Sequence, residues 1–134
     1  MSVTRALTLE LIDATGTATE LQAELSYDNR DPYAVSAAFL TTDTMVRWVF
    51  ARELLAQGLY EPTGDGDVHV WPCLDARGTA VTIIELSSPD GEALLQAHSR
   101  EVSEFLQRTE GLVASGTESD LVDLDAALAH LIGE

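Results

Sequence analysis

The sequence has no lysine, and its strongly basic side chains are seven arginines spread along 134 residues. Aspartate and glutamate together number 23, so the formal net charge is −16 at pH 7. Proteins that hold nucleic acid backbones or anionic membrane surfaces use clustered lysine and arginine, and no such cluster occurs here. The composition therefore argues against nucleic acid and membrane partners.

This negative charge has two interpretations. It keeps a small protein soluble, or it forms an acidic docking surface for another protein. Composition alone leaves both open.

Long apolar runs and cysteine pairs are also missing. No segment approaches the roughly 20 apolar residues that span a bilayer. Glu10 and Asp13 interrupt the leucine-rich start of the chain, and no small-residue cleavage site follows, so we expect no signal peptide. The single cysteine, Cys73, rules out a disulfide within this sequence and fits a reducing cytoplasm. The length predicts one domain, residues 1–134.

Motifs for common chemistries are absent as well. The sequence has no glycine-rich phosphate loop, no Gly-x-Ser-x-Gly elbow and no repeated cysteine pair. Residues 64–67 (Gly-Asp-Gly-Asp) precede a predicted strand and not a helix, so they are not a dinucleotide-binding turn. We therefore predict no catalytic, cofactor-binding or metal-binding residue, and no enzyme activity.

Residues 46–72 contain both tryptophans and form the segment around which we expect the fold to be organised. Val46, Trp48 and Phe50 alternate with other residues, which predicts a strand with one apolar face. A helix of about two turns follows, because apolar or small residues then recur at helical spacing. These residues are Ala51, Leu54, Leu55 and Gly58.

The end of this helix and the return of the chain are marked by turn residues. Gly58 is interpreted as the left-handed residue that ends the helix, and Pro62 prevents its continuation. Residues 63–67 read as a turn, and residues 68–71 as a returning strand.

The rest of the chain alternates as strands and then changes to helical periodicity. Further strands are predicted at residues 7–11, 21–27, 33–40, 80–86 and 92–98. Ser99 is expected to cap the clearest amphipathic helix, residues 99–113, and Asp123 to cap a last helix, residues 123–132. The predicted order is four strands, a short helix, three or four strands and two helices.

Two strands are apolar on both faces. The strand at 80–86 is interrupted only by Thr82 and Glu85, so we expect it to be central and covered twice. The strand at 33–40 has a second face of small or apolar residues, which something is expected to cover.

Histidine and cysteine are the first candidates for chemistry. His69, His98 and His130 lack a second ligand at metal-site spacing, so we interpret them as structural or surface residues. Cys73 has no base or cationic neighbour in its local sequence, and we expect it to be buried or half-buried.

Acidic residues offer a second set of candidates. Asp65 and Asp67 flank Gly66, but the following residues do not continue a calcium-binding loop, so a turn is favoured. A further cluster near the C-terminus comprises Glu118, Asp120, Asp123 and Asp125. Acids at a helix start are stabilised by the helix dipole, which explains part of the cluster. The remainder could face a partner.

Several blocks of sequence resemble the SsgA-like proteins of sporulating actinobacteria, and most closely their SsgB branch. The resemblance covers about residues 27–132. The most distinctive blocks are residues 31–35 (Asp-Pro-Tyr-Ala-Val), 48–55 (Trp-Val-Phe-Ala-Arg-Glu-Leu-Leu), 62–68 (Pro-Thr-Gly-Asp-Gly-Asp-Val) and 86–95 (Leu-Ser-Ser-Pro-Asp-Gly-Glu-Ala-Leu-Leu).

The resemblance implies an α+β fold related to the Whirly proteins. That fold has two antiparallel β-sheets with a short helix between them, two C-terminal helices and a homotrimeric assembly. It also implies a non-enzymatic role in sporulation-specific cell division at the cytoplasmic side of the septum. The implied partners are cell-division proteins, including the tubulin-like one, and other SsgA-like proteins. The resemblance carries no catalytic residues, cofactor or metal onto this chain, and the partner-binding residues stay unassigned.

Three functions remain to be compared. The first is an adaptor that works through protein surfaces. The second is a single-stranded nucleic-acid-binding protein, suggested by the Whirly-like fold alone and disfavoured by the net charge of −16. The third is a small enzyme, which a deep polar pocket with perturbed pKa values would support. A trimer interface has a physical rationale, because strands 33–40 and 80–86 offer more apolar area than two short helices readily cover.

Overall fold

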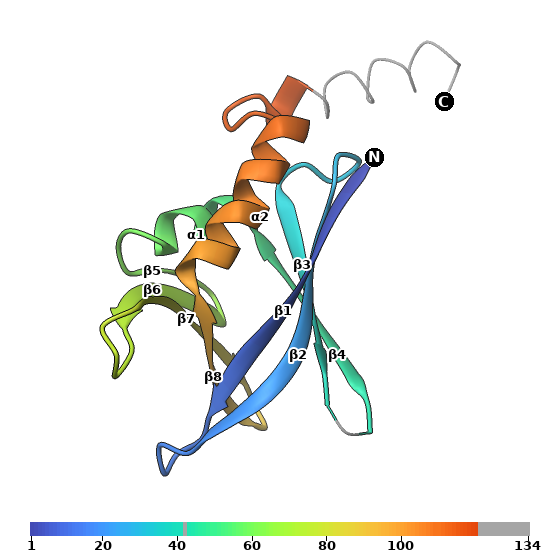
Figure 1. Ribbon diagram of the computed structural model, residues 1–134. Coiled ribbons are helices and arrows are strands. Elements are labelled where there is room, and N and C mark those ends of the chain that lie inside the picture. The colour runs from blue at the N-terminus through green and yellow to red at the C-terminus, as the bar shows by residue number, and fades with distance from the viewer. Residues whose placement is uncertain (42, 121–134) are drawn as a thin grey trace.

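The computed structural model describes residues 1–41 and 43–120. The elements in these residues are β1 (Ser2–Ile12), β2 (Ala18–Asp28), β3 (Ala34–Leu40), β4 (Met45–Ala51), α1 (Arg52–Gly58), β5 (Thr63–Asp65), β6 (Val68–Leu74), β7 (Ala80–Ser88), β8 (Gly91–His98) and α2 (Ser99–Leu112) (Figure 1). None of the described helices is both long enough and apolar enough to cross a bilayer. The helix predicted at residues 123–132 lies outside the described residues.

The described strands form one antiparallel sheet with the order β4-β3-β2-β1-β8-β7-β6-β5. The α+β class is confirmed, but the expectation of two separate sheets was wrong. The two four-stranded halves are joined where β1 pairs with β8 over Glu10–Gln96, Leu11–Leu95 and Ile12–Leu94. Beyond this short seam the halves diverge, and the sheet curls around α2 (Figure 1). Alternation reveals the two faces of each strand, but it does not identify the neighbouring strand.

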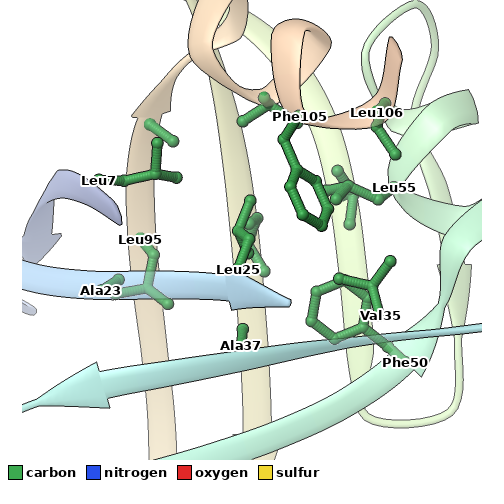
Figure 2. Packing of buried hydrophobic residues seen from close by; sticks show 14 of the residues in the cluster. Leu7, Ala23, Leu25, Val35, Ala37, Phe50, Leu55, Leu95, Phe105 and Leu106 are labelled. Atoms are coloured by element: carbon green, nitrogen blue, oxygen red, sulfur yellow. The ribbon is translucent and has the colours of Figure 1, made fainter. Parts of the chain in front are cut away.

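The hydrophobic core lies on the inner face of the curled sheet. Leu55 from α1 and Phe105 from α2 are each 0% exposed and point toward strand residues such as Leu25 and Leu95 (Figure 2). Full burial of a leucine or phenylalanine side chain contributes about 1.5–3 kcal/mol. The amphipathic stripe predicted for α2 is confirmed, because Val102, Phe105, Leu106 and Thr109 are its buried residues.

Gly58 has a different role from the one predicted. It is the last residue of α1, and it is not among the glycines with positive φ. A Cβ atom placed on Gly58 would lie 2.1 Å from Cγ1 of Val70. The glycine is therefore needed for close packing of α1 against β6, which sequence spacing does not reveal.

The start of α2 also differs in detail. The N-cap position is His98, without a side-chain cap, and Ser99 is the first helical residue. The hydroxyl of Ser99 lies 2.9 Å from that of Thr82 on β7, so it links the helix to the sheet.

The segment expected to be a turn at residues 63–67 contains a short strand. β5 pairs Thr63 with Val70 and Asp65 with Val68, and the turn itself is confined to Gly66 and Asp67. Gly66 has φ of 61°, a conformation that glycine adopts without steric cost.

The two strands with two apolar faces have different environments. β7 is interior, and Val81 and Ile83 are 1% and 9% exposed although they do not belong to the core cluster that contains Ile84 and Leu86. Ile83 lies between Trp71 and Gln96 on the neighbouring strands, which shield it. On the outer face of β3, Ala38 is buried, whereas Leu40 is 52% exposed. The uncovered apolar area therefore lies near β3 and not on β7.

Candidate functional surface

The two histidines in the described part of the chain, His69 and His98, do not meet in a site. His69 is half-exposed on β6, and its Nδ1 lies 3.6 Å from Glu85 Oε1 on β7. His98 is exposed at the end of β8, and His130 lies outside the described residues. In the described ranges, no three histidine, cysteine, aspartate or glutamate side chains are grouped so that they could hold a metal ion.

Cys73 is exposed, so the prediction that it is buried or half-buried was wrong. It lies on the outer face near the end of β6, which extends beyond the predicted strand to Leu74. Val81 on β7 pairs with Cys73 on β6 and with His98 on β8. Cys73 and His98 are therefore two strand spacings, about 10 Å, apart. This arrangement does not form a hydrogen-bonded cysteine–histidine pair.

The acidic candidates separate into different environments. Asp65 belongs to β5 and Asp67 to the turn that follows, where its carbonyl accepts a hydrogen bond from the Ser87 amide at 2.9 Å. Glu118 forms an ion pair with Arg52, with 15% of its side chain exposed. Asp120 is exposed, and the other two acids of the predicted cluster, Asp123 and Asp125, lie outside the described residues. The Glu118 carboxylate is therefore used in contacts within the protein.

Arg52, which sequence spacing did not single out, is a buried cation with 3% exposure. Its Nη1 donates to the Val113 carbonyl at 2.7 Å and to the Thr109 carbonyl at 3.3 Å, and its Nη2 donates to Glu118. Val113 directly follows α2, so its carbonyl has no intrahelical partner and the guanidinium supplies one, whereas the Thr109 carbonyl also accepts the Val113 amide. Arg52 thus ties the β4–α1 junction to the C-terminal end of α2.

Tyr27 completes this buried arrangement. The guanidinium carbon of Arg52 lies 4.8 Å from the centre of the Tyr27 ring, and the Tyr27 hydroxyl donates to the Pro32 carbonyl at 2.9 Å. Burial raises the pKa of Tyr27, with Arg52 opposing the shift. Burial alone would raise the pKa of Glu118, but hydrogen bonds from Arg52 and from backbone N–H groups bring it below 4.5. We assign a structural role to this cluster, because its donors and acceptors are used within the protein.

Shallow hollows occur near the start of α2. One of about 350 Å³ is lined by Arg5, His98, Arg100 and Glu101, among others. The hydrogen bond with Glu104 at 3.0 Å is the main reason that the pKa of Arg5 is raised. This shift comes from an ion pair between β1 and α2, so it does not indicate a catalytic group.

Exposed apolar side chains gather on the ribbon formed by β3 and β4. They are Leu40, Met45, Val46 and Val49, with exposures of 41–60%. The expectation of one apolar face on β4 is only partly confirmed, because Phe50 is buried but Val46 is largely exposed. A hollow of about 390 Å³ on the outer face adjoins the ribbon at Arg47 and Val49.

The chain matches a known protein family over residues 21–118, described as the Streptomyces sporulation and cell division protein SsgA. It is 49% identical over 129 residues to the sporulation-specific cell division protein SsgB of Streptomyces coelicolor, covering 96% of this chain and 93% of the relative. It is 46% identical over 130 residues to the protein of that name from Thermobifida fusca, covering 96% and 94%.

Solved structures show the same relationship. A crystal structure of an SsgA-like sporulation-specific cell division protein from Thermobifida fusca superposes with a TM-score of 0.89 at 44% identity, covering 97% of this chain and 95% of the other. A structure from work on SsgB mutations and longitudinal cell division in Streptomyces coelicolor has a TM-score of 0.85 at 47% identity, covering 90% and 95%. The chain therefore belongs to the SsgA-like family of sporulation and cell-division proteins, and within it to the SsgB branch.

Proposed function

We propose that this protein is a non-enzymatic regulator of sporulation-specific cell division that acts through contacts with other proteins. The observation that carries the proposal is its identity of 49% to an SsgB protein over nearly the whole length of both chains.

The proposed site of action is the cytoplasmic side of the division septum. There the protein would help select the septum position and recruit the tubulin-like division protein or related septation and cell-wall machinery. Its partners would be cell-division proteins and other SsgA-like proteins, without nucleic acid and without insertion into the membrane.

A fluorescent fusion expressed from its own locus in the sporulating host tests this proposal. We expect fluorescent bands at future septa, and we expect deletion of the gene to abolish regular sporulation septa. Uniform fluorescence together with unchanged septation in the deletion strain would refute the proposal.

The proposed assembly is a homotrimer. The supporting observation is the exposure of two apolar side chains, Leu40 on β3 (52%) and Val46 on the opposite face of β4 from Met45 and Val49 (41%), whereas β7 is already covered within one chain. Light scattering after size-exclusion chromatography is expected to give three times the 14.4 kDa mass of the chain. A monomer mass at micromolar concentration would count against the trimer.

Binding of single-stranded nucleic acid is expected to be absent. Four of the seven arginines contact carboxylates within the described residues, namely Arg5, Arg30, Arg52 and Arg100. Cations already neutralised by the protein are poorly available to phosphates. An electrophoretic assay with single-stranded DNA at low salt should therefore show no shift.

A further inference from the structure

The two edges of the sheet are protected very differently. At one end β5 is three residues long and carries Gly64 and Asp65, and a short, charged strand discourages pairing with another chain. At the other end β4 has seven residues, pairs with β3 on one side, and carries no acid (Figure 1). An edge strand of this length with apolar side chains favours addition of a further strand.

The backbone hydrogen bonds show which groups of β4 are available. The amide of Arg52 donates to the Tyr33 carbonyl at 2.7 Å, and the amide of Thr41 donates to the Thr44 carbonyl at 2.8 Å. Tyr33–Arg52 and Thr41–Thr44 are therefore hydrogen-bonded pairs at the two ends of the β3–β4 ladder. In an antiparallel ladder such pairs alternate with pairs that exchange no hydrogen bond. The N–H and C=O groups of the alternate residues therefore point away from β3. These residues, named the β4 edge here, are Met45, Arg47, Val49 and Ala51.

The side chains of the β4 edge have a defined pattern on the outer face. Met45 and Val49 are 53% and 60% exposed, and Arg47 lies between them along the strand. The guanidinium of Arg47 donates to the Ser36 hydroxyl at 3.0 Å, and no carboxylate contacts it among the described residues. In a chain with 23 acids and seven arginines, this cation is available to an acid from outside.

A second copy of this chain is a poor occupant of the β4 edge. Antiparallel pairing of β4 with itself is two-fold and closes a dimer, so it does not build the three-fold assembly proposed above. The opposite edge consists of β5, which has three residues, and of the end of β6 that β5 does not pair with, where Pro72 has no N–H to donate. Each copy also carries a net charge of −16, and β4 offers no acid to face the partner's Arg47.

We propose that the β4 edge receives an extended segment of another protein in which one acidic residue stands between two apolar residues at alternate positions. Backbone pairing with β4 places the acid opposite Arg47 and the apolar residues opposite Met45 and Val49, because every second residue of a strand faces the same side. The inference rests on the proposed function, since it names a surface through which the regulator would hold a partner.

A library of random nine-residue peptides displayed on phage tests this inference directly. The immobilised full chain is expected to enrich the pattern apolar-x-acid-x-apolar. Val49→Pro removes one outward N–H while it leaves the β3–β4 ladder intact, and it should abolish the enrichment. Val49→Thr retains the N–H and the branched shape, so it serves as the matched control and should retain the pattern. Equal enrichment by the wild type and Val49→Pro, or none by the wild type, would overturn the inference.

A charge exchange keeps the inference testable if Val49→Pro fails to fold. The enriched peptide, made with a fluorescent label, should bind Arg47→Glu about tenfold more weakly than wild type, and a peptide with lysine in place of the acid should restore binding. Amide shifts in NMR should occur at Arg47 and Val49 and not at Asp65. If neither Arg47→Glu in the protein nor lysine in the peptide changes the affinity, Arg47 does not contact the acid of the peptide.

Two measurements separate this inference from its alternatives. Sedimentation should give the same mass for the wild type and for Val49→Thr and Val49→Pro, and a lower mass for Val49→Pro alone would show a second copy on the β4 edge and overturn the inference. A second result would also overturn the inference: a Val49→Pro protein that binds no peptide, yet as a fluorescent fusion forms septal bands and supports normal septation. The proposed function would then still stand. Absence of septal bands from the wild type would instead refute the proposed function.

Discussion

Arg47 and Arg52 are five residues apart in the same segment, yet their environments are opposite. Arg52 is 3% exposed and donates to two helix-end carbonyls and a carboxylate. Arg47 lies on the edge strand β4, and its guanidinium donates a hydrogen bond to the Ser36 hydroxyl. The difference shows that a positive charge in this acidic chain is enclosed by acceptors where the fold surrounds it and stays exposed to solvent where the sheet ends.

The largest expected effect on stability comes from Arg52→Met. Arg52→Met removes the guanidinium donor from Glu118 and from the Val113 carbonyl, so the free energy of unfolding should fall by about 3 kcal/mol. Arg47→Met is the matched control and should change it by less than about 0.5 kcal/mol. Urea unfolding at one fixed protein concentration measures both. Equal losses of unfolding free energy in the two variants would show that Arg52 is no more important for stability than Arg47.

Tyr27→Phe should have the next largest effect. The substitution keeps the aromatic ring against Arg52 but leaves the buried Pro32 carbonyl without its donor, which costs about 1–2 kcal/mol. Tyr33→Phe changes a tyrosine that is 51% exposed and should have little effect on the same urea midpoint. A destabilisation of Tyr33→Phe equal to that of Tyr27→Phe would show that the buried hydrogen bond is unimportant.

Glu118→Gln is expected to cost about 1 kcal/mol at pH 7, because the charge-assisted bond to Arg52 is weakened. The pKa of Glu118 is lower in the folded protein than its ordinary value of 4.5, so the carboxylate stabilises the fold above that pH. This contribution is lost as the pH falls through the folded pKa, and the difference between wild type and variant should shrink there. Glu61→Gln, at an exposed position, is the control and should change the free energy of unfolding at pH 7 by less than about 0.5 kcal/mol.

The smallest effect on stability is expected for Arg47→Glu. Its side chain is exposed and contacts Ser36 alone among the residues described, so the unfolding midpoint should remain within about 0.5 kcal/mol of wild type. Circular dichroism during urea titration measures this. A loss of stability as large as that of Arg52→Met would mean that Arg47 is structural. The weaker peptide binding expected of Arg47→Glu could then not be assigned to a direct contact.

Much of the secondary structure could be predicted from local patterns. The helical spacing of Val102, Phe105 and Leu106 identified the buried stripe of α2, because one element determines which of its own residues share a face. The same reasoning failed for Gly58 and Cys73. Packing of Gly58 against Val70 and exposure of Cys73 depend on where β6 lies relative to other elements.

The sequence by itself determined the acidic character, the strand and helix periodicities and the family to which the chain belongs. Tertiary structure decided that the halves join in one sheet, that Arg52 is buried, and that β4 has an open edge. The contacts of Arg52 with Thr109 and Glu118 span 57 and 66 residues of sequence. Local periodicity carries no information on such distant contacts, because it reports which side of an element is apolar and not which element covers that side.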